Sequence, residues 1–145
     1  MDVKVDTNAK EIGKRIKKKG KALSASFKRA LSITAQAGVN IIEARTSKGD
    51  GFKGGKFEGY STKGKNGGYA GFRERKGRGL TPDLQFTGQM LSSMTSRASS
   101  KQAEIFFARA TESKKAAMNN KTRPFFGFSK REEKQLGEIL FRALK

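Results

Sequence analysis

Residues 8–45, NAKEIGKRIKKKGKALSASFKRALSITAQAGVNIIEAR, decide the architecture that the rest of the chain must fit. Asn8 is a candidate N-cap, and Glu11 three residues later completes a pair like a capping box. We expect one long helix over 8–45, with Gly20 as the point where it could break. Its apolar residues recur at three-, four- and seven-residue spacings that share one face: Ile12, Ile16, Leu23, Phe27, Leu31, Ala35 and Ile42.

The rest of this helix surface is basic, with Lys14, Lys17, Lys18, Lys21 and Lys28 on it. Two interpretations fit an apolar stripe beside a basic face. In the first, the stripe faces the protein's own core and the lysines are solvated. In the second, part of the helix binds a partner.

The whole chain is strongly basic, with 32 Lys+Arg against 13 Asp+Glu and a formal charge of +19 over 145 residues. Such a balance predicts attraction to polyanions, whether nucleic acid, an anionic membrane surface or an acidic protein. The length suits one domain, so we expect residues 1–145 to form a single domain. The core should be modest, because only 34% of residues are hydrophobic.

The composition argues against catalysis. Cysteine and histidine are both absent, which removes thiolate nucleophiles, the usual zinc ligands and the commonest general base. The carboxylates are scattered rather than paired. Gly49–Gly54 matches GxGxxG but follows a predicted helix instead of a strand, so it does not predict a dinucleotide site. We therefore expect no catalytic, cofactor-binding or metal-binding residues, and no enzyme activity.

The sequence also predicts no membrane association through a span or a signal peptide. No apolar run approaches the roughly 20 residues that a transmembrane helix needs. The first residues, MDVKVDTNAKEIGKR, lack the apolar stretch of a signal peptide. We expect a soluble protein made in a cytoplasm.

Residues 46–80 differ sharply from the helix before them. Eleven of the seventeen glycines lie between Gly49 and Gly79, and ordering so much glycine is entropically costly. We expect an extended Gly/Lys-rich loop or arm. Its aromatic residues are candidate anchors at a protein interface: Phe52, Phe57, Tyr60, Tyr69 and Phe72. Its cations are candidates for contact with DNA or with an acidic protein: Lys53, Lys56, Lys63, Lys65, Arg73, Arg75, Lys76 and Arg78.

Regular structure is expected again over 81–145. Alternation at Leu84 and Phe86 predicts a short strand, and Thr87 can cap a brief helix carrying Met90, Leu91 and Met94. Two further strands are predicted over 95–99 and 102–108, and residues 110–121 suit either a helix or a loop. The predicted fold is α+β, with a long N-terminal amphipathic helix and a C-terminal helix packed on a small, mostly antiparallel sheet.

The C-terminal helix has the clearest start signal in the chain. Pro124 disfavours helix in the residue before it, and Ser129 with Glu132 forms an S-x-x-E capping box. Phe125, Phe126 and Phe128 come just before this helix. They suit a hydrophobic staple and core plug, and at least one is also a candidate to insert into a neighbouring subunit.

Three short blocks occur in a recognisable order along the chain. Phe57, Tyr60 and Ser61 form an F-x-x-Y-S element within the glycine-rich segment. The second block comprises Leu84, Thr87, Gly88, Met90 or Leu91, and Ser93. The third is the Arg-Pro-Phe-Phe-Gly-Phe-Ser string at 123–129. In order and spacing, these blocks make the chain resemble the phage virion-morphogenesis and tail-completion proteins.

The resemblance implies a structural virion protein of a tailed bacteriophage, located at the neck or tail and made in the cytoplasm of the bacterial host. It implies a homo-oligomeric ring, hexameric by the six-fold symmetry of phage tails, with connector or adaptor and tail tube or terminator proteins as partners. Nonspecific contact with DNA in the lumen would suit the positive charge. Many relatives carry histidine where this chain has Ser113–Asn120, so neck completion, tail termination and a minor tail component stay open.

A function from another class also fits the residues. The chain could be a basic nucleic-acid-binding protein whose aromatic and Lys/Arg-rich loop grips phosphates and stacks on bases. No recognisable nucleic-acid-binding motif surrounds that loop.

Overall fold

The structure is a computed structural model that describes the backbone of residues 9–145 and the side chains of residues 14–145. It is α+β, as predicted from the sequence. Its elements in chain order are α1 (Ala9–Ser47), a 3₁₀ turn (Lys65–Gly67), α2 (Gly68–Arg75), α3 (Gln89–Ser92), β1 (Met94–Ala98), β2 (Ala103–Phe107), α4 (Ala110–Thr122) and α5 (Lys130–Ala143).

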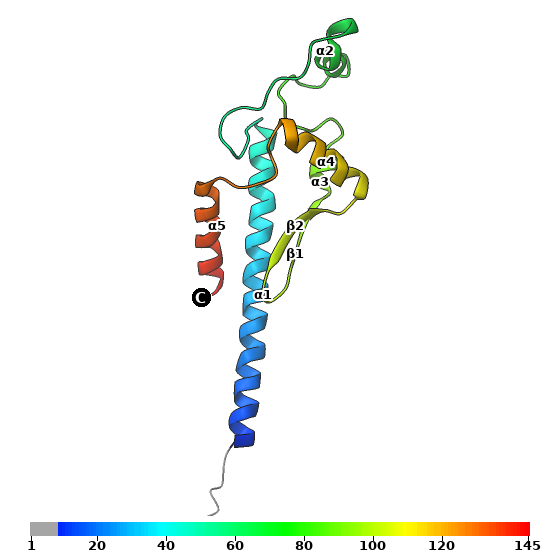
Figure 1. Ribbon diagram of the computed structural model, residues 1–145. Coiled ribbons are helices and arrows are strands. Elements are labelled where there is room, and N and C mark those ends of the chain that lie inside the picture. The colour runs from blue at the N-terminus through cyan, green and yellow to red at the C-terminus, as the bar shows by residue number, and fades with distance from the viewer. Residues whose placement is uncertain (1–8) are drawn as a thin grey trace, which may run out of the picture.

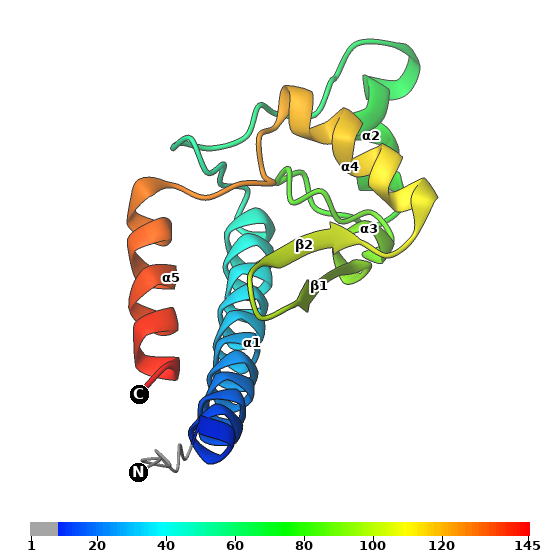
Figure 2. The same cartoon turned by 60° about the horizontal axis from the view of Figure 1, so that its bottom comes forward.

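Helix α1 is the long axis of the molecule, and the other elements gather around its C-terminal half (Figure 1). It continues through Gly20 without a break. The predicted cap at Asn8 lies outside the described residues. Helix α5 runs antiparallel beside α1, and the strand pair lies against another side of it (Figures 1 and 2).

Strands β1 and β2 form an antiparallel hairpin in which Met94 pairs with Phe107 and Ala98 with Ala103. The two strands predicted over 95–99 and 102–108 are thus confirmed, and in the turn between them the Ser99 amide donates to the Gln102 carbonyl over 2.8 Å. Gly38 of α1 lets the hairpin approach closely. A Cβ there would lie 2.9 Å from both the Ile105 side chain and the Phe128 ring. The sheet thus packs directly on the helix backbone.

The core lies at the junction of α1, α3, β1, α4 and the segment before α5. Its buried members come from separate segments between residues 39 and 125: Val39, Ile42, Phe57, Met90, Leu91, Met94, Ala116 and Phe125. Alternation in a strand and helical spacing in α1 therefore supply one shared core. Phe125 is fully buried in it, which confirms the core-plug interpretation for that residue.

Arg45, near the end of α1, joins this core to α5. Its guanidinium forms an ion pair with Glu132 and donates to the carbonyls of Phe125 and Gly127. Glu132 also accepts from the Ser129 amide, and its own amide donates to the Ser129 hydroxyl. The predicted capping box is confirmed, and Arg45 connects it to the C-terminal end of α1.

The strand predicted at Leu84–Phe86 is wrong. A carboxylate oxygen of Asp83 accepts from the Gln85 amide over 2.9 Å, which closes an Asx turn in place of a strand ladder. Leu84 then has a φ of 56°, a left-handed conformation that is uncommon for a leucine. The short helix after it does form as α3, but Gly88 stands at its N-cap instead of the predicted Thr87. Residues 110–121, whose sequence suits either a helix or a loop, are helical in α4.

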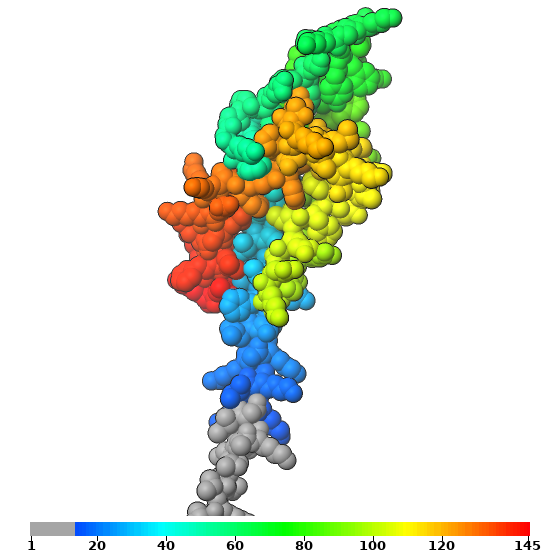
Figure 3. All heavy atoms as spheres, viewed as in Figure 1, coloured from blue at the N-terminus to red at the C-terminus, as the bar shows by residue number. Residues whose placement is uncertain are grey.

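The N-terminal part of the described helix stands apart from this body. Every residue from Lys14 to Arg29 is exposed, and burial begins at Ala30. Figure 3 shows this part of α1 extending alone beyond α5 and the hairpin. Among the described helices, none is long and apolar enough to cross a membrane.

Replacing Arg45 by methionine should lower the free energy of unfolding by about 2 kcal/mol, because it leaves a largely buried Glu132 and two carbonyls without their donor. Chemical denaturation measures this loss. Arg97→Met is the control, since Arg97 pairs with Glu104 on the open surface of the hairpin and should cost less than about 1 kcal/mol. Equal losses in both variants would contradict the role given to Arg45.

Glu132 should make stability depend on acid pH. Burial alone would raise its pKa, but the Ser129 amide and the Arg45 guanidinium outweigh burial and lower the pKa below its ordinary value of 4.5. A lowered pKa in the folded state stabilises the protein above pH 4.5, and that contribution is lost as the pH falls through the lowered pKa. The difference in unfolding free energy between the wild type and Glu132→Gln should therefore be largest near pH 7 and shrink toward pH 3. Denaturation at several pH values, with exposed Glu133→Gln as control, measures it. A constant difference would contradict the assignment.

Candidate functional site

Residues 60–86 form a small second cluster beyond the core, built from aromatic rings and arginines. The ring of Tyr69 lies 5.1 Å from Tyr60 and 6.2 Å from Phe72, and Phe72 stacks on Phe86 at 5.5 Å. Two of these rings come from α2, and the others come from the loops before and after it. The arm predicted over 46–80 is thus not irregular throughout, because a helix and a ring cluster order its outer part.

Arg73 lies at the centre of the cluster and is 1% exposed. Its guanidinium lies over the Tyr60 ring at 4.5 Å, donates to the Gly79 carbonyl at 3.0 Å and pairs with Asp83 at 3.3 Å. Those contacts close the loop from α2 back to the Asx turn. The expectation that Arg73 faces DNA or a lumen is therefore wrong, since it is enclosed and fully engaged within the arm.

Arg123 attaches the arm to the segment between α4 and α5. It donates to the carbonyls of Glu58 and Gly59 at 2.8 and 3.0 Å. Its guanidinium carbon also lies 4.9 Å from the centre of the Tyr60 ring. Burial raises the pKa of Tyr60, and the charge of Arg73 offsets only part of that effect. Tyr60 thus lies between two guanidinium groups and stays a neutral phenol near pH 7.

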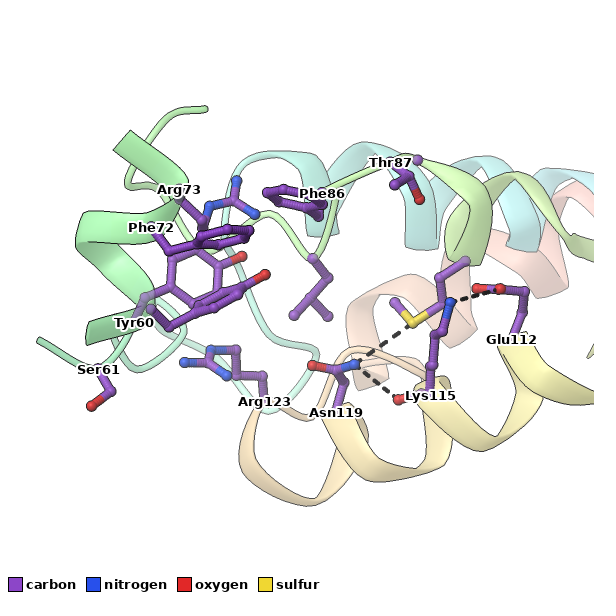
Figure 4. A pocket seen from close by; sticks show the side chains of 14 residues that line it. Tyr60, Ser61, Phe72, Arg73, Phe86, Thr87, Glu112, Lys115, Asn119 and Arg123 are labelled. Atoms are coloured by element: carbon purple, nitrogen blue, oxygen red, sulfur yellow. Dashed lines mark hydrogen bonds and ion pairs between the residues drawn. The ribbon is translucent and has the colours of Figure 1, made fainter. Parts of the chain in front are cut away.

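An open pocket of about 470 Å³ separates this cluster from α4. Figure 4 shows Tyr60, Phe72 and Phe86 on one side and Glu112, Lys115 and Asn119 on the other. Glu112 is buried. One of its carboxylate oxygens accepts from Lys115 at 2.9 Å, and the other has no hydrogen-bond partner among the described residues. The accessible walls of the pocket are thus mainly aromatic and basic, because Glu112 itself is buried.

Apart from Tyr60, which lies beside Arg73 and Arg123, the predicted interface aromatics divide into three groups. Phe57 and Phe125 are core residues, so the structure does not offer them as surface anchors. Phe52 packs against Gly127, where a Cβ would lie 2.7 Å from its ring, and Phe126 and Phe128 are half-buried beside the core. Tyr69 and Phe72 remain exposed, at 44% and 39%, along the open pocket.

The predicted basic residues are also not equivalent. Lys56 pairs with Asp50 at 2.9 Å, and Arg75 donates to the Asn66 carbonyl at 2.7 Å. The others are exposed and form no ion pair within residues 14–145: Lys53, Lys63, Lys65, Lys76 and Arg78. The arm therefore presents a scattered basic surface around a buried arginine.

Sequence reasoning does not identify the α4 side of the pocket, or Phe86 and Arg123 as parts of it. Alternation places Phe86 in a strand, and Arg123 stands out only for its place before proline. Asp83 between proline and leucine is the available signal for a turn that would direct Phe86 toward the arm. Nothing in the local pattern around Glu112 indicates burial.

No protein-family model, curated protein or solved structure matches the chain. Within the described residues, no group of three or more acidic side chains is arranged to hold a metal ion. The site combines aromatic rings with exposed and buried cations.

Replacing Arg73 by alanine should open the arm while leaving the main core folded, because Arg73 joins Tyr60, Gly79 and Asp83 but does not reach the core residues. Trypsin cleavage at 75–78 should become at least about tenfold faster, since local opening controls the exposure of this segment. Glu74→Ala, which changes an exposed side chain on the same helix and leaves the trypsin sites intact, is the control. Unchanged cleavage in Arg73→Ala would contradict the structural role of Arg73.

Proposed function

We propose that the protein is a structural component of a tailed-phage virion that acts in tail completion or at the neck between head and tail, without a catalytic role. The order of three sequence blocks supports this function through the resemblance described above. The observation that carries it is that the apolar stripe of α1 extends beyond the part that the rest of the chain covers.

The stripe is continuous in sequence but only half of it is core. Toward its C-terminal end, Ala35 and Ile42 are buried. Toward the N-terminus, Ile16, Leu23 and Phe27 are exposed by 66, 60 and 37%. A large side chain left in water forgoes about 1.5–3 kcal/mol relative to full burial. A protein that works as an isolated copy gains nothing from this second half, whereas a subunit that meets neighbours there does.

A ring of copies would account for the exposed apolar side chains at both ends of the molecule. At one end the free part of α1 would lay its stripe on an adjacent copy. At the other end Tyr69 and Phe72 of the arm present exposed rings, the residue type that dominates interface energetics. Connector or adaptor proteins on one side and tail tube or terminator proteins on the other are the proposed partners, and the virion is the proposed location.

The alternative of a nucleic-acid-binding protein that grips through residues 46–80 has less support. Its central arginine, Arg73, is buried, and Arg75 and Lys56 are engaged within the chain. The proposal for the arm is therefore contact with proteins.

The double substitution Ile16→Ser and Leu23→Ser should dissociate the assembly into monomers, because it removes the two most exposed members of the stripe without touching the core. Light scattering of the wild type at low and moderate salt should show a salt-resistant multimer, and negative-stain imaging should show rings. Met118→Ser is the control, since Met118 is an even more exposed apolar side chain, on α4. A wild type that is monomeric under all conditions and does not co-purify with virions would refute the proposed function.

A further inference from the structure

The free part of α1, residues 14–29, carries the densest positive charge in the chain. Within residues 14–29, half of the positions are cations, and the first acidic residue after them is Glu43. All of these cations are exposed, and none forms a hydrogen bond or ion pair through its side chain with another described residue. The members of this basic face are Lys14, Arg15, Lys17, Lys18, Lys19, Lys21, Lys28 and Arg29.

These cations repel one another along the helix. Lys14, Lys17, Lys18 and Lys21 follow at three- and four-residue spacings, where side chains are neighbours. Like charges at such spacings destabilise a helix by about 0.2–0.5 kcal/mol per pair. Every described residue of this stretch is exposed, so packing does not compensate for the repulsion. A polyanion that neutralises the face would therefore also stabilise the helix.

We propose that this basic face binds the phosphate backbone of duplex DNA, with the free helix lying in the major groove. Sixteen residues of helix span about 24 Å, over which B-DNA presents about 14 phosphate charges. An α-helix with its side chains is about 10–12 Å wide and the major groove about 12 Å. Because the body of the protein begins only at Ala30, nothing else in the described chain obstructs entry of this stretch into a groove (Figure 3).

The shape of the apolar stripe favours DNA over a membrane surface. A helix that lies in a lipid interface needs a broad face of bulky apolar residues. Here Ile16, Leu23 and Phe27 form a narrow line with Gly20 within it, and Lys19 and Lys17 flank that line. The cations thus cover most of the helix circumference. This arrangement suits the major groove, whose two walls place phosphates on both sides of a bound helix.

The inference is independent of the proposed virion function. Lys18, Lys21 and Lys28 of the basic face lie on the side of α1 away from the stripe, so neighbouring copies can cover the stripe while DNA occupies that side. Variants in the two faces separate the two proposals, since Ile16→Ser with Leu23→Ser changes no charge and the lysine variants below keep the stripe.

The decisive experiment compares two proteins with the same net charge. In the first, glutamine replaces Lys17, Lys18, Lys21 and Lys28 of the basic face. In the second, it replaces four exposed lysines elsewhere: Lys101, Lys121, Lys130 and Lys134. Glutamine and lysine have similar helix propensities, so both should fold, and circular dichroism checks this. Fluorescence anisotropy with a labelled 30-base-pair DNA duplex, over a series of salt concentrations, measures affinity.

We expect the wild type to bind with a steep salt dependence. The basic-face variant should bind at least about tenfold more weakly near 100 mM salt, with a log–log slope shallower by about 0.9 for each phosphate that it no longer neutralises. The variant with lysines replaced elsewhere should keep most of the affinity and slope. Arginine at the four basic-face positions should restore binding. Adding DNA to the wild type should raise the helical signal.

Several outcomes would overturn the proposal. One is equal weakening in both glutamine variants, which would indicate net charge alone. Others are no binding by the wild type near 50 mM salt, or equal affinity for an RNA duplex, whose deep and narrow major groove excludes a helix. Binding to anionic phosphatidylserine vesicles that depends on the four lysines, with DNA binding unchanged by their loss, would assign the face to a membrane instead.

Discussion

The structure depends on one largely buried guanidinium that connects three segments of the chain. The two terminal nitrogens of Arg45 join the last turn of α1 to the Phe-Phe-Gly segment and to the first turn of α5, while its buried Nε has no hydrogen-bond partner among the described residues. Those contacts fix Phe125 in the core and set where α5 begins, and so they determine which face of α5 meets α1. Without a partner for that charge, burial would cost several kcal/mol. The start of α5 is therefore tied to the end of α1 through one side chain.

Arg73 and Arg123 likewise donate to backbone carbonyls, and such contacts explain how so basic a chain folds with few carboxylates. These arginines are neutralised mainly by backbone carbonyls and aromatic faces, and only Arg45 and Arg73 also use an acidic partner. Arginine suits this role because its planar group donates in several directions and stacks on rings. Lysine lacks that geometry, and the described lysines of this chain are left on the surface.

Elements with a strong local signal were predictable from the sequence. Helical spacing predicted α1, alternation predicted the hairpin, and Ser129 with Glu132 predicted the start of α5. The failures came where a single side chain overrides the pattern. Asp83 turns the chain where Leu84 and Phe86 alternate, and Arg73 organises residues whose glycine content indicates only mobility. The pocket was not predictable either, because it joins residues from three separate segments and has no periodicity. Phe57 illustrates the same limit, since nothing local distinguishes a core ring from an exposed one in a glycine-rich stretch.

The unbroken course of α1 through Gly20 has a geometric consequence. Because the helix is continuous, both the distance of its free part from the core and the direction in which each side chain points are fixed. One residue added between Arg29 and Ala30 would lengthen the rod by only about 1.5 Å but would rotate everything beyond it by about 100°. Seven added residues would extend it by about 10 Å and nearly restore the original orientation. The number of residues in this helix thus sets both the distance and the rotation angle, relative to the core, of any molecule that binds its free part.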